Sequence, residues 1–99
     1  MPEYRWMSYA AAARYLPAAA AAQVSVVARS KRGFMGQYRQ AQTVANMRKR
    51  PVRGYQQTWG QRRHNFIRRH MAQYAKHPTY RRWLALVMWA YRPGPAPAK

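Results

Sequence analysis

The stretch from Thr58 to Arg92 constrains the fold of this 99-residue chain more than any other, because one strong break interrupts its helical periodicity. Between Trp59 and Lys76, apolar residues recur at a spacing of three and four, which predicts an amphipathic helix. Pro78 lacks a backbone N–H and disfavours helical dihedral angles at His77, so this helix should end there. A second helix is expected over residues 79–91, which gives a helical hairpin and a mostly α fold class.

The two faces of the first predicted helix differ in character. One face collects apolar and aromatic residues, together with one histidine: Trp59, Phe66, Ile67, His70, Met71 and Tyr74. The opposite face carries basic residues: Arg62, Arg68, Arg69 and Lys76. Only Arg63 lies inside the apolar arc, where we expect its aliphatic stem to pack while its charged head reaches outward.

The second predicted helix is apolar on almost every side, with an unbroken apolar run from Trp83 to Tyr91. Thr79 or His77 is expected to cap its start. One partner helix cannot cover so many apolar faces. The sequence therefore predicts a protein-docking surface directed away from the hairpin, buried by a neighbouring protein or alternatively by a lipid surface, and made of Leu86 and Trp89.

The charge of the chain limits its possible functions. Nineteen Lys and Arg residues face one acidic residue, Glu3, which gives a formal net charge of +18. Self-repulsion on that scale opposes a compact isolated chain, so we expect a polyanionic partner or an assembly that supplies negative charge. A single carboxylate excludes paired-carboxylate catalysis, and the lack of cysteine excludes disulfides and thiolate metal sites. We therefore expect no enzyme activity, no cofactor and no small-molecule substrate.

The histidines do not form a convincing metal motif. His64, His70 and His77 are separated by six and seven residues, whereas zinc ligands on one helix usually lie four residues apart. No carboxylate or thiolate stands beside them. We expect surface or interface histidines and no bound metal.

Residues 1–28 form an Ala-rich segment that is expected to contain one short helix, from Ser8 to Leu16, which Ser8 caps weakly and Pro17 ends. Residues 18–28 remain ambiguous, because alanine favours helix while the valines favour extended structure. The beginning of the chain is Arg-rich and poor in acids, as organelle targeting segments are. This composition predicts a mitochondrial location, in the matrix or at the matrix face of the inner membrane.

Residues 29–57 are expected to comprise a basic loop, a short helix and an extended basic arm. The loop lies between Arg29 and Gly36, the helix runs from Gln37 to Arg48, and the arm follows from Arg48 to Gly54. A proline and a glycine keep the arm extended. We interpret it as a segment lying along a phosphate backbone, and the alternative is a solvated linker. The helical hairpin then covers residues 58–92, and a Pro-rich tail follows over 93–99.

Most of the positive charge is carried by arginine, which suits bidentate contacts to phosphate and stacking on unpaired bases. The basic residues gather in the loop, in the arm and in Arg-Arg doublets on the predicted helices. We predict that the following residues bind RNA: Arg29, Lys31, Arg32, Arg48, Lys49, Arg50, Arg53, Arg62, Arg68, Arg69, Arg81 and Arg82.

The stretch from Ile67 to Arg92 resembles the end of the fifteenth small-subunit ribosomal protein of bacteria and organelles. The shared pattern is a His before an apolar residue, a basic turn, an Arg-Arg doublet and a Leu-rich helix, here His70-Met71, Lys76-His77, Arg81-Arg82 and Leu84–Val87. The Thr-Gly-Ser signature that this family carries further upstream is absent. The resemblance implies a ribosomal setting.

Two functions follow from these patterns. The first is a structural component of a ribosome, in mitochondria, which binds ribosomal RNA and docks on neighbouring ribosomal proteins. The alternative is a non-catalytic peripheral subunit of a mitochondrial inner-membrane complex, such as ATP synthase or a respiratory complex, which contacts acidic subunits and cardiolipin. No apolar run approaches the ~20 residues that a membrane-spanning helix requires.

Overall fold

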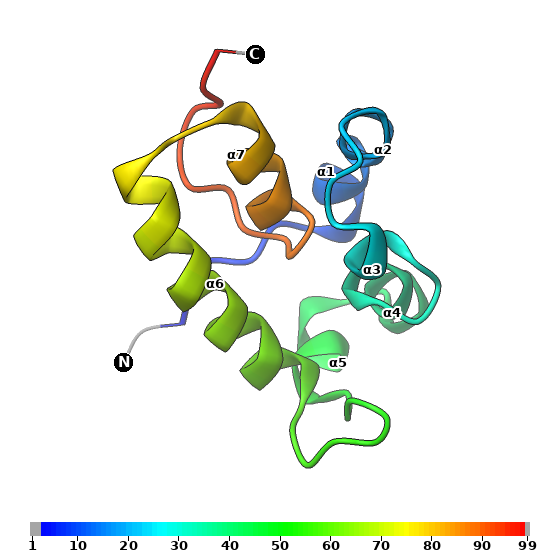
Figure 1. Cartoon of the computed structure of the whole chain (residues 1–99). Helices are drawn as coiled ribbons and strands as arrows, with labels where there is room; N and C mark the ends of the chain where they lie inside the picture. The colour runs from blue at the N-terminus through cyan, green and yellow to red at the C-terminus, as the bar shows by residue number, and fades with distance from the viewer. Residues whose placement is uncertain (1–2, 99) are drawn as a thin grey trace.

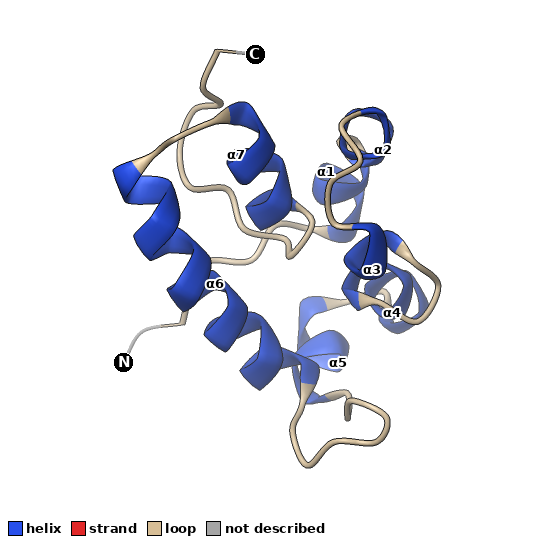
Figure 2. Cartoon of the chain, in the orientation of Figure 1, coloured by secondary structure: helices blue, strands red, loops and turns tan. Residues whose placement is uncertain are grey.

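Seven α-helices joined by short turns make up most of residues 3–98, which are the residues that the computed structural model describes, and these residues contain no β-strand (Figures 1 and 2). The predicted mostly α fold class is confirmed. The helices are α1 (Tyr9–Ala13), α2 (Leu16–Ala21), α3 (Val26–Arg29), α4 (Phe34–Ala41), α5 (Val44–Lys49), α6 (Trp59–Lys76) and α7 (Tyr80–Val87).

Helices α6 and α7 form the predicted hairpin, and side chains near each break cap them. The Thr58 hydroxyl accepts a hydrogen bond from the Gln61 N–H at 3.2 Å, and the Gln61 side chain accepts one from the Thr58 N–H at 2.9 Å. This reciprocal capping box fixes the start of α6. Thr79 caps α7 by accepting from the Arg82 N–H at 3.2 Å, which confirms the expected cap.

Helix α7 is shorter than predicted, because it ends at Val87 and not at Tyr91. Ala90 adopts a left-handed conformation with φ of 59°. The Tyr91 N–H donates to the Leu86 carbonyl at 3.2 Å, and the Ala90 N–H donates to the Val87 carbonyl at 2.8 Å. This pair of bonds is that of a Schellman turn, in which glycine usually occupies the left-handed position. An alanine there needs support from outside the helix.

Arg63 of α6 supplies that support. The expectation that its charged head reaches outward is wrong, since only 1% of the residue is exposed. Its Nε donates to the Trp89 carbonyl at 2.7 Å, and its Nη2 donates to the Ala90 carbonyl at 3.0 Å. The same guanidinium donates to the carbonyls of Tyr4 at 3.0 Å and of Arg5 at 2.8 Å. One side chain thus ties the end of α7 to α6 and to the N-terminal segment.

The buried guanidinium of Arg63 is satisfied without a carboxylate partner in direct contact. Its central carbon lies 4.0 Å from the centre of the Trp6 ring, so a cation–π contact adds to the hydrogen bonds. Burial lowers the pKa of Arg63 to about 10, and the negative charge of Glu3 partly opposes that shift. The group therefore remains a cation at neutral pH.

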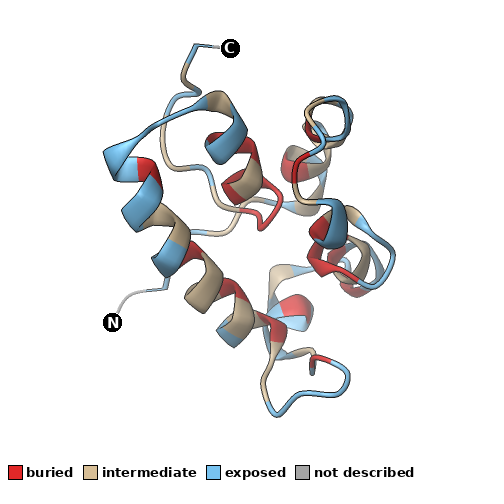
Figure 3. Cartoon of the chain, in the orientation of Figure 1, coloured by how far each residue is buried: buried red, intermediate tan, exposed pale blue. Residues whose placement is uncertain are grey.

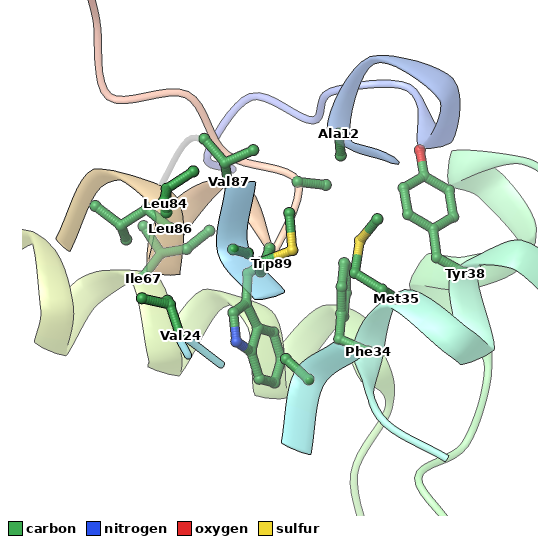
Figure 4. Packing of buried hydrophobic residues seen from close by; sticks show 14 of the residues in the cluster. Ala12, Val24, Phe34, Met35, Tyr38, Ile67, Leu84, Leu86, Val87 and Trp89 are labelled. Carbon is green, nitrogen blue, oxygen red and sulfur yellow. The ribbon is translucent and has the colours of Figure 1, made fainter. Parts of the chain in front are cut away.

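The core lies between the hairpin and a second layer formed by the N-terminal half of the chain (Figure 3). Trp89 stacks on Phe34 of α4 at 4.8 Å between ring centres (Figure 4). It also stacks on Phe66 of α6 at 4.4 Å. Trp83 meets Tyr15 edge-on at 5.0 Å. The apolar surplus of the second hairpin helix is thus covered by the same chain.

The predicted protein-docking surface is corrected by this packing. Leu86 is fully buried, and Trp89 is 8% exposed, both within the chain's own core. The sequence prediction counted only the hairpin as a source of cover. It missed that α1–α5 carry enough apolar side chains to close over the other faces of α7.

The N-terminal segment differs from the prediction at Pro17. Helix α1 is capped by Ser8, as expected, but Pro17 lies in the first turn of α2 and does not end a helix. A proline is tolerated there because the first N–H groups of a helix have no intrahelical partner. Residues 18–28 are mainly helical, and left-handed residues Gln23 and Ser25 connect α2 to α3.

The single helix predicted over residues 37–48 is in fact two. Helix α4 begins at Phe34 and stops where Gln42 takes a positive φ of 70°. Thr43 then caps α5 by accepting from the Asn46 N–H at 3.1 Å. The start of the predicted extended arm is therefore helical, since α5 continues through Lys49.

Two glycines of the predicted basic loop, Gly33 and Gly36, allow close packing of the backbone. A Cβ added at Gly33 would lie 1.9 Å from the Val27 carbonyl oxygen, and one at Gly36 would lie 2.2 Å from the Lys31 carbonyl oxygen. The backbone of α4 thus approaches α3 and the turn after it more closely than any side chain permits.

Replacing Arg63 with methionine is expected to lower the free energy of unfolding by roughly 3 kcal/mol, because buried carbonyls lose their donors. Urea denaturation followed by tryptophan fluorescence measures this change. Arg68→Met, an exposed site on the same helix with the same loss of charge, should change stability by no more than about 0.5 kcal/mol. Equal stability of the two variants would contradict the anchoring role of Arg63.

Gly36→Ala is expected to destabilise the fold by roughly 3 kcal/mol, because the new methyl group meets backbone that cannot move aside. Gly54→Ala is the control: its Cβ meets nothing within 4 Å, although φ is +84°. Only the left-handed backbone conformation disfavours an alanine at this position, and we expect a loss of about 1 kcal/mol in the free energy of unfolding. Thermal unfolding followed by circular dichroism compares the two, and a smaller loss at Gly36 would contradict the close helix approach.

Candidate nucleic-acid interface

The positive charge of the protein lies almost wholly on its surface. Among residues 3–98, Arg63 is the only buried Lys or Arg. Within the same range, the only ion pair joins Arg48 to Glu3 at 2.7 Å. The other surface cations therefore have no carboxylate partner in the described part of the chain, and the surface attracts anions.

The twelve residues predicted to bind RNA are all at least partly accessible. Nine of them are exposed: Lys31, Arg32, Arg48, Lys49, Arg53, Arg68, Arg69, Arg81 and Arg82. Three are half-buried: Arg29, Arg50 and Arg62. Accessibility alone does not bring them together, and the structure distributes them over several parts of the surface.

Some of these arginines also brace the fold. Arg81 of α7 donates to the carbonyls of Ala22 and Gln23, the latter at 3.3 Å, and so holds the end of α2 against α7. Arg82 donates to the His77 carbonyl at 3.0 Å. The sequence prediction assigned this doublet to RNA binding only and missed that it donates hydrogen bonds to carbonyl groups of turns.

Four of the predicted residues converge on one cleft of about 490 Å³: Arg32, Arg50, Arg53 and Arg62. Its walls come from α3, α4, the loop over residues 50–58, the first turn of α6 and Trp89. The loop runs through the lower part of Figure 1, beside the start of α6. No acidic side chain lines the cleft, so its positive charges are not neutralised from within.

Arg50 is fixed at the wall of this cleft by neutral groups. Its Nε donates to the Gln37 side-chain oxygen at 2.8 Å, and its Nη2 donates to that of Gln40 at 2.9 Å. Amide oxygens orient the guanidinium without cancelling its charge. The Arg50 carbonyl also accepts from the Trp59 N–H at 2.8 Å, which joins the base of the loop to α6.

Aromatic rings accompany the charges in the cleft. Tyr55, near the tip of the loop, is 63% exposed. The guanidinium carbon of Arg62 lies 4.9 Å from the Tyr55 ring centre and 5.7 Å from that of Trp59. The sequence prediction did not include Tyr55. The available signal was an aromatic residue directly after Gly54, between a basic arm and a helix start.

The remaining predicted contacts lie elsewhere. Arg29 and Lys31 line a second hollow, of about 580 Å³, and Arg81 and Arg82 line a third, of about 670 Å³. The others are exposed on α5 and α6: Arg48, Lys49, Arg68 and Arg69. The predicted set is therefore not one continuous binding surface.

The three histidines take separate positions. His70 stacks on Phe66 with 3.9 Å between ring centres, and His64 lies 5.1 Å from the Tyr4 ring. His77 is exposed at the end of α6. Within residues 3–98, no three His, Cys, Asp or Glu side chains gather as metal ligands would.

The chain matches no protein-family model and shows no significant similarity to the curated proteins or solved structures with which it was compared. Across the described residues, no helix has both the length and the apolar character needed to span a bilayer.

His70 should make stability depend on pH. Burial lowers its pKa below the ordinary value of 6.5, and the positive charge of Arg69 lowers it further. The unfolded chain then takes up a proton before the folded protein does, so the free energy of unfolding should fall as the pH drops from about 7 towards 5. His70→Gln should flatten this dependence in urea titrations at several pH values, whereas His77→Gln should retain it. An unchanged slope in His70→Gln would contradict the assignment.

Proposed function

We propose that this protein is a structural, non-enzymatic component of a ribosome, in mitochondria, and that it binds ribosomal RNA. The observation that carries the proposal is the cleft in which four guanidinium groups meet aromatic rings without any carboxylate. Bringing like charges together is unfavourable unless an anionic ligand compensates them. RNA supplies both the phosphates and the base faces that such a surface can contact.

The proposed mechanism is charge neutralisation and shape recognition. Surface arginines displace counterions from the phosphate backbone, which gives affinity without dependence on sequence. The cations outside the cleft would extend these contacts to neighbouring RNA helices. The resemblance of residues 67–92 to a small-subunit ribosomal protein agrees with this setting.

Contacts with neighbouring ribosomal proteins require a surface other than Leu86 and Trp89. Val26 of α3 is 63% exposed, and it does not line the cleft. We place the proposed contact with a neighbouring protein there, so the docking surface moves from α7 to Val26 of α3.

The alternative, a peripheral subunit of a mitochondrial membrane complex, has lost the feature that favoured it. The aromatic run of residues 83–91 suited a lipid headgroup interface, but Trp83 is fully buried and Trp89 is 8% exposed. Arginines still suit acidic subunits and cardiolipin. The sedimentation experiment below therefore also tests this alternative.

A tagged copy of the protein is expected to sediment with ribosomal subunits from detergent-solubilised mitochondria, and RNase treatment is expected to release it. Sucrose-gradient sedimentation with and without RNase makes the measurement, and a known integral ribosomal protein serves as the control. Persistent sedimentation with a membrane complex after RNase treatment would overturn the ribosomal proposal and favour the alternative.

A further inference from the structure

We propose that the cleft between α3–α4 and the loop over residues 50–58 holds an unpaired nucleotide of single-stranded RNA. In this arrangement the base stacks on Tyr55, and the adjacent phosphate contacts Arg62. The inference rests on the proposed function and specifies the ligand of its central cleft. The shared chemistry is an unpaired base next to a phosphate, which DNA also offers, so the test includes both nucleic acids.

Two exposed apolar side chains lie at the cleft. Among residues 3–98, the exposed large hydrophobic side chains are Val26, Val27 and Tyr55. Val27 and Tyr55 both line this cleft, although they come from α3 and from the loop before α6. Exposed aromatic rings beside cationic grooves are the usual platforms for bases of single-stranded nucleic acids.

Arg62 lies directly beside Tyr55. Its guanidinium lies 4.9 Å from the Tyr55 ring centre, so charge and stacking surface are adjacent. A nucleotide has the same adjacency, since each base is joined through its sugar to a phosphate. Arg32 and Arg53 line the same cleft and provide further positive charge for the flanking phosphates.

The cleft has no internal counterion. The single acidic residue of the chain, Glu3, pairs with Arg48 and does not line the cleft. Arg50 is held by the side-chain oxygens of Gln37 and Gln40, which leave its charge uncompensated. A lipid headgroup or an acidic peptide without aromatic residues would neutralise these charges, but neither offers a flat ring for the exposed face of Tyr55.

The ligand must be unpaired because a duplex hides its base faces. In A-form RNA the bases are stacked on one another, so a protein ring reaches a base only in loops, bulges and single strands. The cleft volume of about 490 Å³ lies within the range of roughly 300–1,000 Å³ typical of sites for small ligands. A single nucleotide of a longer strand is of that scale.

The test measures fluorescence anisotropy of the full chain with labelled oligo(U), and repeats it with inorganic polyphosphate as a polyanion without bases. Tyr55→Ala is expected to weaken oligo(U) binding about tenfold, because one base loses its stacking platform. It should leave polyphosphate binding unchanged. Tyr55→Phe, which keeps the ring, should bind oligo(U) like the parent protein. Tyr55 is exposed on a loop, and circular dichroism checks that both variants fold.

Arg62→Ala and Arg68→Ala provide a matched pair, since both remove one positive charge from α6. Arg62→Ala should weaken the binding of both oligo(U) and polyphosphate. It should also reduce the slope of log affinity against log salt for oligo(U) by about 0.7. Arg68→Ala, outside the cleft, should have a smaller effect on oligo(U) affinity. Equal effects of the two substitutions would contradict the placement of the phosphate at Arg62.

Three results would overturn the inference. The first is an equal effect of Tyr55→Ala on oligo(U) and polyphosphate, or no effect on either. The second is that an oligo(A)·oligo(U) duplex competes with labelled oligo(U) for the protein as effectively as single-stranded oligo(U) does. The third is binding of poly-glutamate that depends on Tyr55 as strongly as oligo(U) binding does, which would indicate an acidic protein partner. Oligo(dT) bound as tightly as oligo(U) would overturn the assignment to RNA.

Failure of this inference and failure of the proposed function give different results. If the protein sediments with ribosomal subunits but Tyr55→Ala has no effect on oligo(U), the cleft assignment is wrong and the ribosomal role stands. If oligo(U) binding depends on Tyr55 but the protein does not sediment with ribosomes, the ribosomal role is wrong. The cleft would then serve another RNA.

Discussion

The fold depends on one buried cation, Arg63, and on the four backbone carbonyls that accept its hydrogen bonds. A buried charge is tolerated only where polar groups replace its water, and this chain has a single carboxylate to offer. Backbone carbonyls at the end of α7 and in the N-terminal segment accept the hydrogen bonds that water or a carboxylate would otherwise accept. Because these carbonyls belong to segments about 60 and 27 residues away, one side chain joins the two ends of the sequence.

The burial of Arg63 among carbonyls leaves the protein surface with almost all of the positive charge. With one cation buried and one paired to Glu3, the remaining charge of the described chain faces outward without neutralisation. The aromatic residues are distributed in the opposite way: six are buried in the core, among them Phe34 and Trp89 (Figure 4), and seven more pack against it partly buried. Tyr55 is the exposed exception, and it lies where arginines are concentrated. The cleft is therefore the place where a largely exposed aromatic ring lies among exposed and half-buried arginines.

Local signals in the sequence predicted part of the fold correctly. The bounds of α6 followed from its apolar periodicity and from Pro78, and the caps at Ser8 and Thr79 followed from their hydroxyl groups. The early end of α7 was not predictable in the same way. Ala90 is left-handed because the Arg63 guanidinium and the Met7 N–H hold its carbonyl, and these groups are remote in sequence. Residue type alone favours continuation of the helix at an alanine.

The sequence by itself determined the helical hairpin, the excess of positive charge and the residues that carry this charge, because these depend on composition and on neighbours along the chain. Tertiary structure alone decided that Leu86 and Trp89 are covered by the chain's own N-terminal half. It also decided that Arg32, Arg50 and Arg62 meet Tyr55 in one cleft. The physical reason is that burial and convergence depend on which distant segments pack together. That packing is set here by the Arg63 bonds and by the close approach of α3 and α4 at two glycines.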